Sequence, residues 1–186
     1  MKLTTRDLLV ELLLKAFDEP VPPDAVRVRA ATLIKQFPSE QAEVTKKLNR
    51  YIVALEEWRV ELRPSARETA LRKAELLFNH HLFFEVHEVL EAQWRIEQDP
   101  PRLFLQGLIQ VAVAFHHLER RNFRGAVSLL HDSLEKIMPY RPSFLGVELQ
   151  EFVTQLIACY QELQRLGPEH CDQFQNTRIP RLQFVT

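Results

Sequence analysis

Prolines divide this chain into segments, and their positions constrain its fold more than any other feature. Nine of the eleven fall at residues 20–23, 38, 64, 100–101, 142 and 168. The segments between them carry apolar residues at helical spacing, and proline is tolerated in the first turn of a helix or beyond its end but not in its interior. Glycines number only four. The sequence therefore predicts an all-α, multi-helix bundle.

The predicted bundle has a three-helix core, with further helices flanking it on the N-terminal side. The core helices are expected near residues 82–97, 102–119 and 123–138. A final helix is expected to open at Pro142-Ser143, because these residues suit a helix start. We divide the chain into an N-terminal helical extension that packs on the core (1–62), a helical core domain (63–167) and an extended C-terminal tail (168–186).

The last helix of the N-terminal extension carries a heptad stripe. Its members are Val44, Leu48, Tyr51, Leu55, Trp58 and Leu62. Three heptads are short for a dimeric coiled coil, so we expect the stripe to pack within the chain. The oligomeric state itself stays open.

Charge and composition argue against several classes of function. Lys and Arg total 24 against 25 Asp and Glu, whereas a nucleic-acid binder carries a basic face. The basic cluster of Arg120, Arg121 and Arg124 is typical of a solvated turn, so we expect no nucleic-acid partner. No apolar run reaches the ~18 residues of a membrane span, and the two cysteines suggest a reducing compartment. We therefore expect a cytoplasmic protein without membrane contact.

Two polar stripes lie on consecutive core helices. The first comprises Phe84, His87, Glu91 and Trp94, and the second Gln106, Gln110, Val113 and His117. Spacings of three and four residues place each set on one helix face. A turn near residues 99–100 makes the helices antiparallel, so paired residue numbers should sum to roughly 199. That register sets Trp94 near Gln106, and Glu91 near Gln110.

A metal site is the first interpretation of these stripes. His87-Glu88-x-x-Glu91 places two ligands one helical turn apart, as zinc-binding His-Glu-x-x-His helices do, with Glu88 as a candidate base. A third ligand could come from His117 or His80. The pattern lacks the Glu-x-x-His pairs of di-iron bundles, and the cofactor stays unknown.

Two other interpretations use the same residues. In one, aromatic walls from Phe84, Trp94 and Phe104 and the polar stripe form a small-ligand pocket. In the other, the stripes form a buried network that fixes the helix register, in which the Trp94 indole donates to Gln106 or Glu91. Glu85 and Glu88 lie off the stripe and are expected to be partly solvated.

Gly107 is unusual because it lies inside a predicted helix. Glycine costs roughly 1 kcal/mol relative to alanine at such a position. We expect a compensating close approach, either of a neighbouring helix or of a ligand.

Three motifs follow one another along the core. They are His87-Glu88-x-x-Glu91-x-x-Trp94, Gln106-Gly107-x-Ile109-Gln110 and Gly125-Ala126, preceded by Phe78-Asn79 and Phe83-Phe84. Over about residues 72–138 this order resembles a bacterial and archaeal family catalogued as domain of unknown function 309. The resemblance implies a compact three-helix core and brings no reaction with it.

A binding module fits these features better than an enzyme. No serine or cysteine is placed as a nucleophile, so we predict a non-catalytic helical domain that binds a protein or small-molecule partner through its core helices. The alternative is a metal-dependent or acid–base enzyme that uses His87, Glu88 and Glu91. The sequence leaves the identity of the partner, substrate and metal open.

Overall fold

The computed structural model describes residues 5–19, 21–35, 41–58 and 65–185 of the chain. Its α-helices are α1 (Thr5–Asp18), α2 (Pro23–Ile34), α3 (Gln41–Glu57), α4 (Ala66–Asn79), α5 (Phe83–Trp94), α6 (Pro101–Glu119), α7 (Phe123–Ile137) and α8 (Gln150–Leu166). Short strands β1 (Ser143–Phe144) and β2 (Val147–Glu148) and the 3-10 turns η2 (Met138–Tyr140), η3 (Cys171–Gln173) and η4 (Asn176–Arg178) complete it. The predicted all-α, multi-helix bundle is confirmed.

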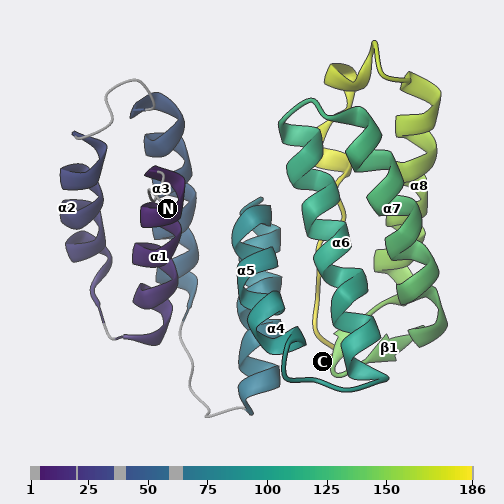
Figure 1. Ribbon diagram of the computed structural model, residues 1–186, viewed down its shortest axis with the longest axis horizontal. Helices are drawn as coiled ribbons and strands as arrows, with labels where there is room; N and C mark the ends of the chain where they lie inside the picture. The colour runs from purple at the N-terminus through teal and green to yellow at the C-terminus, as the bar shows by residue number, and fades with distance from the viewer. Residues whose placement is uncertain (1–4, 20, 36–40, 59–64, 186) are drawn as a thin grey trace.

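The helices fall into three neighbouring groups. Figure 1 shows α1, α2 and α3 together at one end of the molecule, α6, α7 and α8 together at the other, and α4 with α5 between them. Among the helices of the described ranges, none combines the length and hydropathy needed to cross a membrane.

Matching turns join α4 to α5 and α6 to α7. His81 and Arg121 take left-handed φ values of 56° and 57°. In each turn the amide of the following residue donates a hydrogen bond to the carbonyl five residues earlier. Leu82 donates to Leu77, and Asn122 donates to His117, each at 2.9 Å. This is the hydrogen bond of a Schellman helix end. Its repetition makes successive core helices antiparallel.

An aromatic cluster joins the central helices. Phe78 of α4 packs edge-on against Phe83 of α5, Phe115 of α6 and Phe152 of α8, with ring centroids 5.2, 6.0 and 5.8 Å away. All these side chains are buried. Burying such a ring stabilises the fold by about 1.5–3 kcal/mol, and edge-to-face geometry adds to this.

The heptad stripe of α3 packs inside the chain, as predicted. Val44, Leu48, Tyr51 and Leu55 are buried, and α3 contacts α1, α2 and α4. Trp58 packs edge-on against Phe17 of α1, with the ring centroids 5.5 Å apart. The remaining member of the predicted stripe, Leu62, lies outside the described residues.

A β-hairpin stands where a helix start was predicted. The expectation that the last helix opens at Pro142-Ser143 is wrong, because β1 pairs with β2 there and α8 begins at Gln150. Leu145 and Gly146 have φ values of 52° and 82°. A two-residue type I′ hairpin turn requires positive φ at both central residues, and glycine adopts positive φ without a steric penalty.

The C-terminal segment lies against this hairpin and against α4. Phe184 forms a β-bridge with Val147. The Asn79 side chain accepts a hydrogen bond from the Leu182 amide at 2.9 Å and donates one to the Leu182 carbonyl at 2.8 Å. Asn79 therefore pairs with the segment as another strand would.

Gly107 lies where α6 meets the end of α7. A Cβ atom built on Gly107 would come within 2.6 Å of Ile137 Cγ1 and 3.2 Å of Lys136 Cβ. The predicted close approach is therefore that of a neighbouring helix, and it explains the glycine.

Replacing Gly107 with alanine should destabilise the fold. The clash with Ile137 should outweigh the better helix propensity and lower the free energy of unfolding by about 1–3 kcal/mol, as measured by urea denaturation. In a Gly107→Ala/Ile137→Ala double variant the loss should be smaller than the sum of the single losses. Additive losses would contradict this contact.

Candidate functional site

The predicted ligand residues of α5 lie together on its surface. His87 Nδ1 is 3.0 Å from Glu88 Oε1, and His87 Nε2 is 3.6 Å from Glu91 Oε2. One ligand atom from each residue can be chosen so that all lie within 4.8 Å of one another. The side chains are 28–37% exposed. This spacing suits a divalent cation, with one imidazole and two carboxylates as ligands.

One neighbouring charge disfavours metal binding at that site, and others favour it. Arg95 Nη2 lies 3.0 Å from Glu91 Oε1, so a metal ion would compete with a guanidinium for this carboxylate. Glu88 also lines a cavity of about 420 Å³ between α1 and α5, with Asp7, Glu11 and Asp18. Lys15 lies there too and pairs with Glu11, so the carboxylates outnumber the cations by four to one and favour positive charge in the cavity.

The two predicted stripes do not satisfy each other's hydrogen bonds. Trp94 Nε1 and Gln110 Oε1 are buried and have no hydrogen-bond partner among the described residues. The expected donation by Trp94 to Gln106 or Glu91 is therefore wrong. Arg102 instead lies over the indole, 3.8 Å from its centroid, and donates to the Trp94 carbonyl at 3.1 Å. Gln106 is half-buried on α6.

The two other candidate metal ligands, His117 and His80, lie at the C-terminal ends of α6 and α4. His117 Nδ1 is 3.0 Å from Asn122 Nδ2, and a Cβ on Gly125 would come within 3.0 Å of the His117 ring. Burial lowers the pKa of His117, and the charge of His116 lowers it further. His80 Nε2 lies 2.9 Å from Glu57 Oε2. These contacts tie His117 to the start of α7, and His80 to the end of α3.

The predicted register of α5 and α6 is close to the observed one. The Phe83 and Phe115 ring centroids lie 5.5 Å apart, and those of Phe84 and His116 lie 5.6 Å apart. These pairs sum to 198 and 200. Both sums lie within one of the predicted 199.

A second group of polar side chains surrounds a cleft where α3 meets the ends of α4, α5 and α6. The cleft has a volume of about 460 Å³. Its lining is mostly charged or polar: Glu43, Lys46, Lys47, Arg50, His81, Phe83, Phe84, Glu85, His116, Glu119, Arg120 and Asn176. None of its polar residues was among the predicted site residues.

Glu85 lies at the base of this cleft and is fully buried. Lys47 Nζ of α3 lies 2.5 Å from Glu85 Oε1. The expectation that Glu85 is partly solvated is wrong, because α3 covers this side of α5. Burial raises the pKa of the nearby Tyr51 phenol well above its usual range, and the negative charge of Glu85 raises it further. A buried carboxylate is tolerated here because a cation pairs with it.

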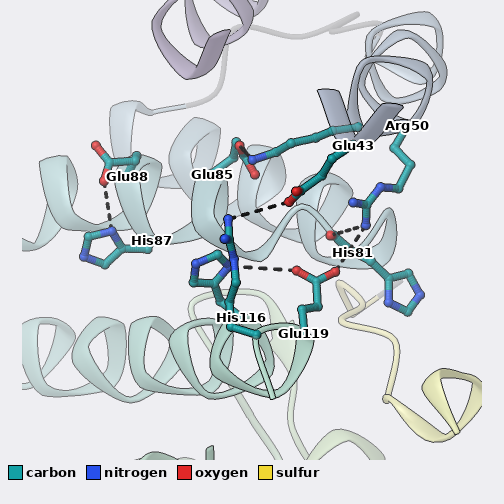
Figure 2. A network of polar contacts seen from close by, with 10 residues as sticks. Glu43, Arg50, His81, Glu85, His87, Glu88, His116 and Glu119 are labelled. Carbon is teal, nitrogen blue, oxygen red and sulfur yellow. Dashed lines mark hydrogen bonds and ion pairs between the residues drawn. The ribbon is translucent and has the colours of Figure 1, made fainter. Parts of the chain in front are cut away.

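Further ion pairs cross the cleft, as Figure 2 shows. Arg50 Nη1 donates to the His81 carbonyl at 2.7 Å and lies 3.4 Å from Glu119 Oε1. The His116 ring lies 3.8 Å from the other Glu119 oxygen. Arg120 Nη2 of the α6–α7 turn lies 3.7 Å from Glu43. Charged groups of α3 therefore meet charged groups of the core along the whole cleft.

Two pKa shifts reflect this environment. Burial would raise the pKa of Glu119, but the hydrogen bond with His116 and the charge of Arg50 together lower it. Burial lowers the pKa of His81, and the positive charge of Arg50 lowers it further. At neutral pH the cleft therefore holds an ionised Glu119 and an uncharged His81.

One signal for this cleft was present in the sequence. Glu43, Lys46, Lys47 and Arg50 recur at spacings of three and four residues beside the apolar stripe of α3. Such a charged face is usually solvated. Only the position of α3 over α5 shows that part of it is covered.

Breaking the buried ion pair should be costly. Lys47→Met leaves the Glu85 carboxylate buried without a cation and should lower the free energy of unfolding by about 3–5 kcal/mol, as measured by urea denaturation. Lys46→Met, at an exposed neighbouring position, is the matched control and should change it by less than about 0.5 kcal/mol.

A double variant separates charge from packing. Lys47→Met/Glu85→Leu should recover most of the lost stability, because apolar groups often replace a buried ion pair at little cost. If Lys47→Met and Lys46→Met were equally stable, Lys47 would not be the partner that Glu85 requires.

Comparison with known proteins bears on the segment that holds His87, Glu88 and Glu91 and the core side of the cleft. Residues 71–129 match the model of a family described as a domain of unknown function, DUF309. The "Uncharacterized protein YpuF" of Bacillus subtilis (strain 168) is 42% identical over 55 residues, 28% of this chain and 30% of that protein. The match thus spans less than a third of the relative's length. The predicted resemblance is confirmed: residues 71–129 match the DUF309 family, as the sequence motifs had indicated.

Proposed function

We propose that this protein is a helical module that binds a small polar ligand in the cleft between α3 and the α5–α6 hairpin, without catalysing a reaction on it. The observation that carries the proposal is the cleft itself, with a volume of about 460 Å³ and charged residues from several helices around it. Ligand sites are typically concave spaces of roughly 300–1,000 Å³ with a few convergent polar groups.

The arrangement of charges supports binding over catalysis. Each carboxylate of the cleft already has a cationic partner: Lys47 for Glu85, Arg50 for Glu119 and Arg120 for Glu43. A carboxylate held in an ion pair is a poor general base, because its charge is already balanced, so among the lining residues that the structure describes His81 is the one uncharged imidazole left for that role. Among the described lining residues none is a serine, threonine or cysteine that could act as a nucleophile.

The proposal gives the N-terminal extension (1–62) a role. Its helix α3 forms one wall of the cleft, and the core domain (63–167) forms the other. Asn176 adds a contact from the C-terminal tail (168–186). We infer further that the protein acts in the cytoplasm, since Cys159 and Cys171 are free thiols, as expected in a reducing compartment.

A ligand screen tests this function. The full chain is heated with compounds of different charge and size, and a ligand of the cleft should raise the melting temperature, because it binds only the folded state. Asn176→Trp, which places a bulky ring at the cleft, should abolish that gain. Thr177→Trp, at the exposed neighbouring position outside the lining, should retain it. If a ligand raised the melting temperature of both variants equally, its binding site would lie outside the cleft.

A second candidate function is supported by the positions of His87, Glu88 and Glu91. Their ligand atoms lie close enough for one metal ion, and the His87–Glu88 contact of 3.0 Å also suits a proton-transferring pair. In this alternative the protein is a metal-dependent or acid–base enzyme, and α5 carries its reactive groups.

Calorimetric titration with zinc, manganese and iron tests the metal site. The alternative predicts binding of one ion per chain at micromolar concentration, and its loss in His87→Ala. His131→Ala is the matched control, because His131 lies 3.6 Å from Asp132 on α7, away from these ligands. The absence of binding, or equal binding by both variants, would contradict a metal site here.

A further inference from the structure

We infer that the ligand of the cleft is a small anion with at least two negative charges, such as a polycarboxylate or a phosphate ester. The inference rests on the proposed function and deepens it by naming the class of ligand. Its basis is the balance of charges and hydrogen-bond donors among the described residues that line the cleft.

The cationic side chains that line the cleft outnumber its carboxylates by one. Four lining residues are always cationic, namely Lys46, Lys47, Arg50 and Arg120, and three are carboxylates, namely Glu43, Glu85 and Glu119. Each carboxylate lies next to one of the cations. Lys46 has no ion pair with any described residue, and its side chain is exposed. An anion entering the cleft would therefore meet an unpaired ammonium group.

The pair between Arg120 and Glu43 is the weakest of these interactions. The two groups are 3.7 Å apart, and their side chains are 54% and 77% exposed. Ion pairs this exposed contribute little, because water and salt screen them. A ligand anion can therefore take the place of Glu43 and bind Arg120 together with Lys46.

Hydrogen-bond donors at the cleft also bear on the class of ligand. Arg50 Nε is buried and has no acceptor among the described residues. The Glu85 oxygens lack a hydrogen-bond donor as well, but the ion pair with Lys47 balances the charge of this carboxylate. The other donors at the cleft are the rings of His81 and His116 and the Asn176 amide. A buried donor without an acceptor is costly, and carboxylate and phosphate oxygens are the acceptors that guanidinium groups bind best.

A cationic ligand fits this cleft poorly. It would approach four cationic side chains, and of the three carboxylates only the exposed Glu43 has a weak partner, whereas Glu85 and Glu119 are paired with Lys47 and Arg50. A neutral polar ligand would leave the Lys46 charge without a partner. The charge balance therefore favours an anion over both.

Calorimetric titration of the full chain with citrate and with pyrophosphate tests the inference and distinguishes the two chemistries. At least one should bind at one molecule per chain, and the one that binds identifies the ligand as a carboxylate or a phosphate. Affinity should fall as salt is added, and by about tenfold in Lys46→Ala or Arg120→Ala, because each change removes a charge-assisted contact. Lys35→Ala removes an exposed lysine outside the cleft and should leave affinity unchanged.

The other outcomes are equally informative. If neither anion binds but a neutral or cationic compound stabilises the protein and Asn176→Trp abolishes that effect, the anion inference is overturned and the proposed function stands. If no compound of any class acts through the cleft, both fail. If Lys35→Ala weakens anion binding as much as Lys46→Ala, the attraction is non-specific and the inference is overturned.

Discussion

The buried ion pair between Lys47 and Glu85 is the interaction on which the arrangement of this protein depends. It joins α3 to α5 at a point where the carboxylate has no access to water. A charge in such a place is tolerated only with its partner present, so the pair fixes where α3 lies on the core. Every other contact across the cleft, from Arg50 to Glu119 and from Arg120 to Glu43, requires α3 to be in that position.

Helix α5 serves both candidate sites because its polar residues point in two directions. Glu85 faces α3 and lies at the base of the cleft, whereas His87, Glu88 and Glu91 lie together on a partly exposed face. Both groups fall within residues 71–129, the segment that matches the DUF309 family. The cleft, however, also needs side chains of α3 and Asn176, which lie outside that segment. A relative with a different N-terminal region could therefore share the exposed residues of α5 without having this cleft.

Local patterns predicted the helices well and predicted the contacts between them less well. Proline positions and helical spacing were sufficient for the bundle, for the α5–α6 register and for the close approach at Gly107. They failed at Leu145-Gly146, where a hairpin turn depends on positive φ in a residue that usually avoids it. They also failed for Glu85 and Trp94, because burial depends on which helix covers a face and on where Arg102 stacks. The cleft escaped prediction because its two walls lie far apart in the sequence.

The most direct test of this account is a high-resolution crystal structure of the full chain as purified, with an anomalous scan for metals. The account predicts Lys47 within ion-pair distance of a buried Glu85, and density for an anion in the cleft in contact with Lys46 and Arg120. A structure in which α3 lies away from Glu85, with ordered metal at His87, Glu88 and Glu91 instead, would contradict it and make the exposed face of α5 the functional site.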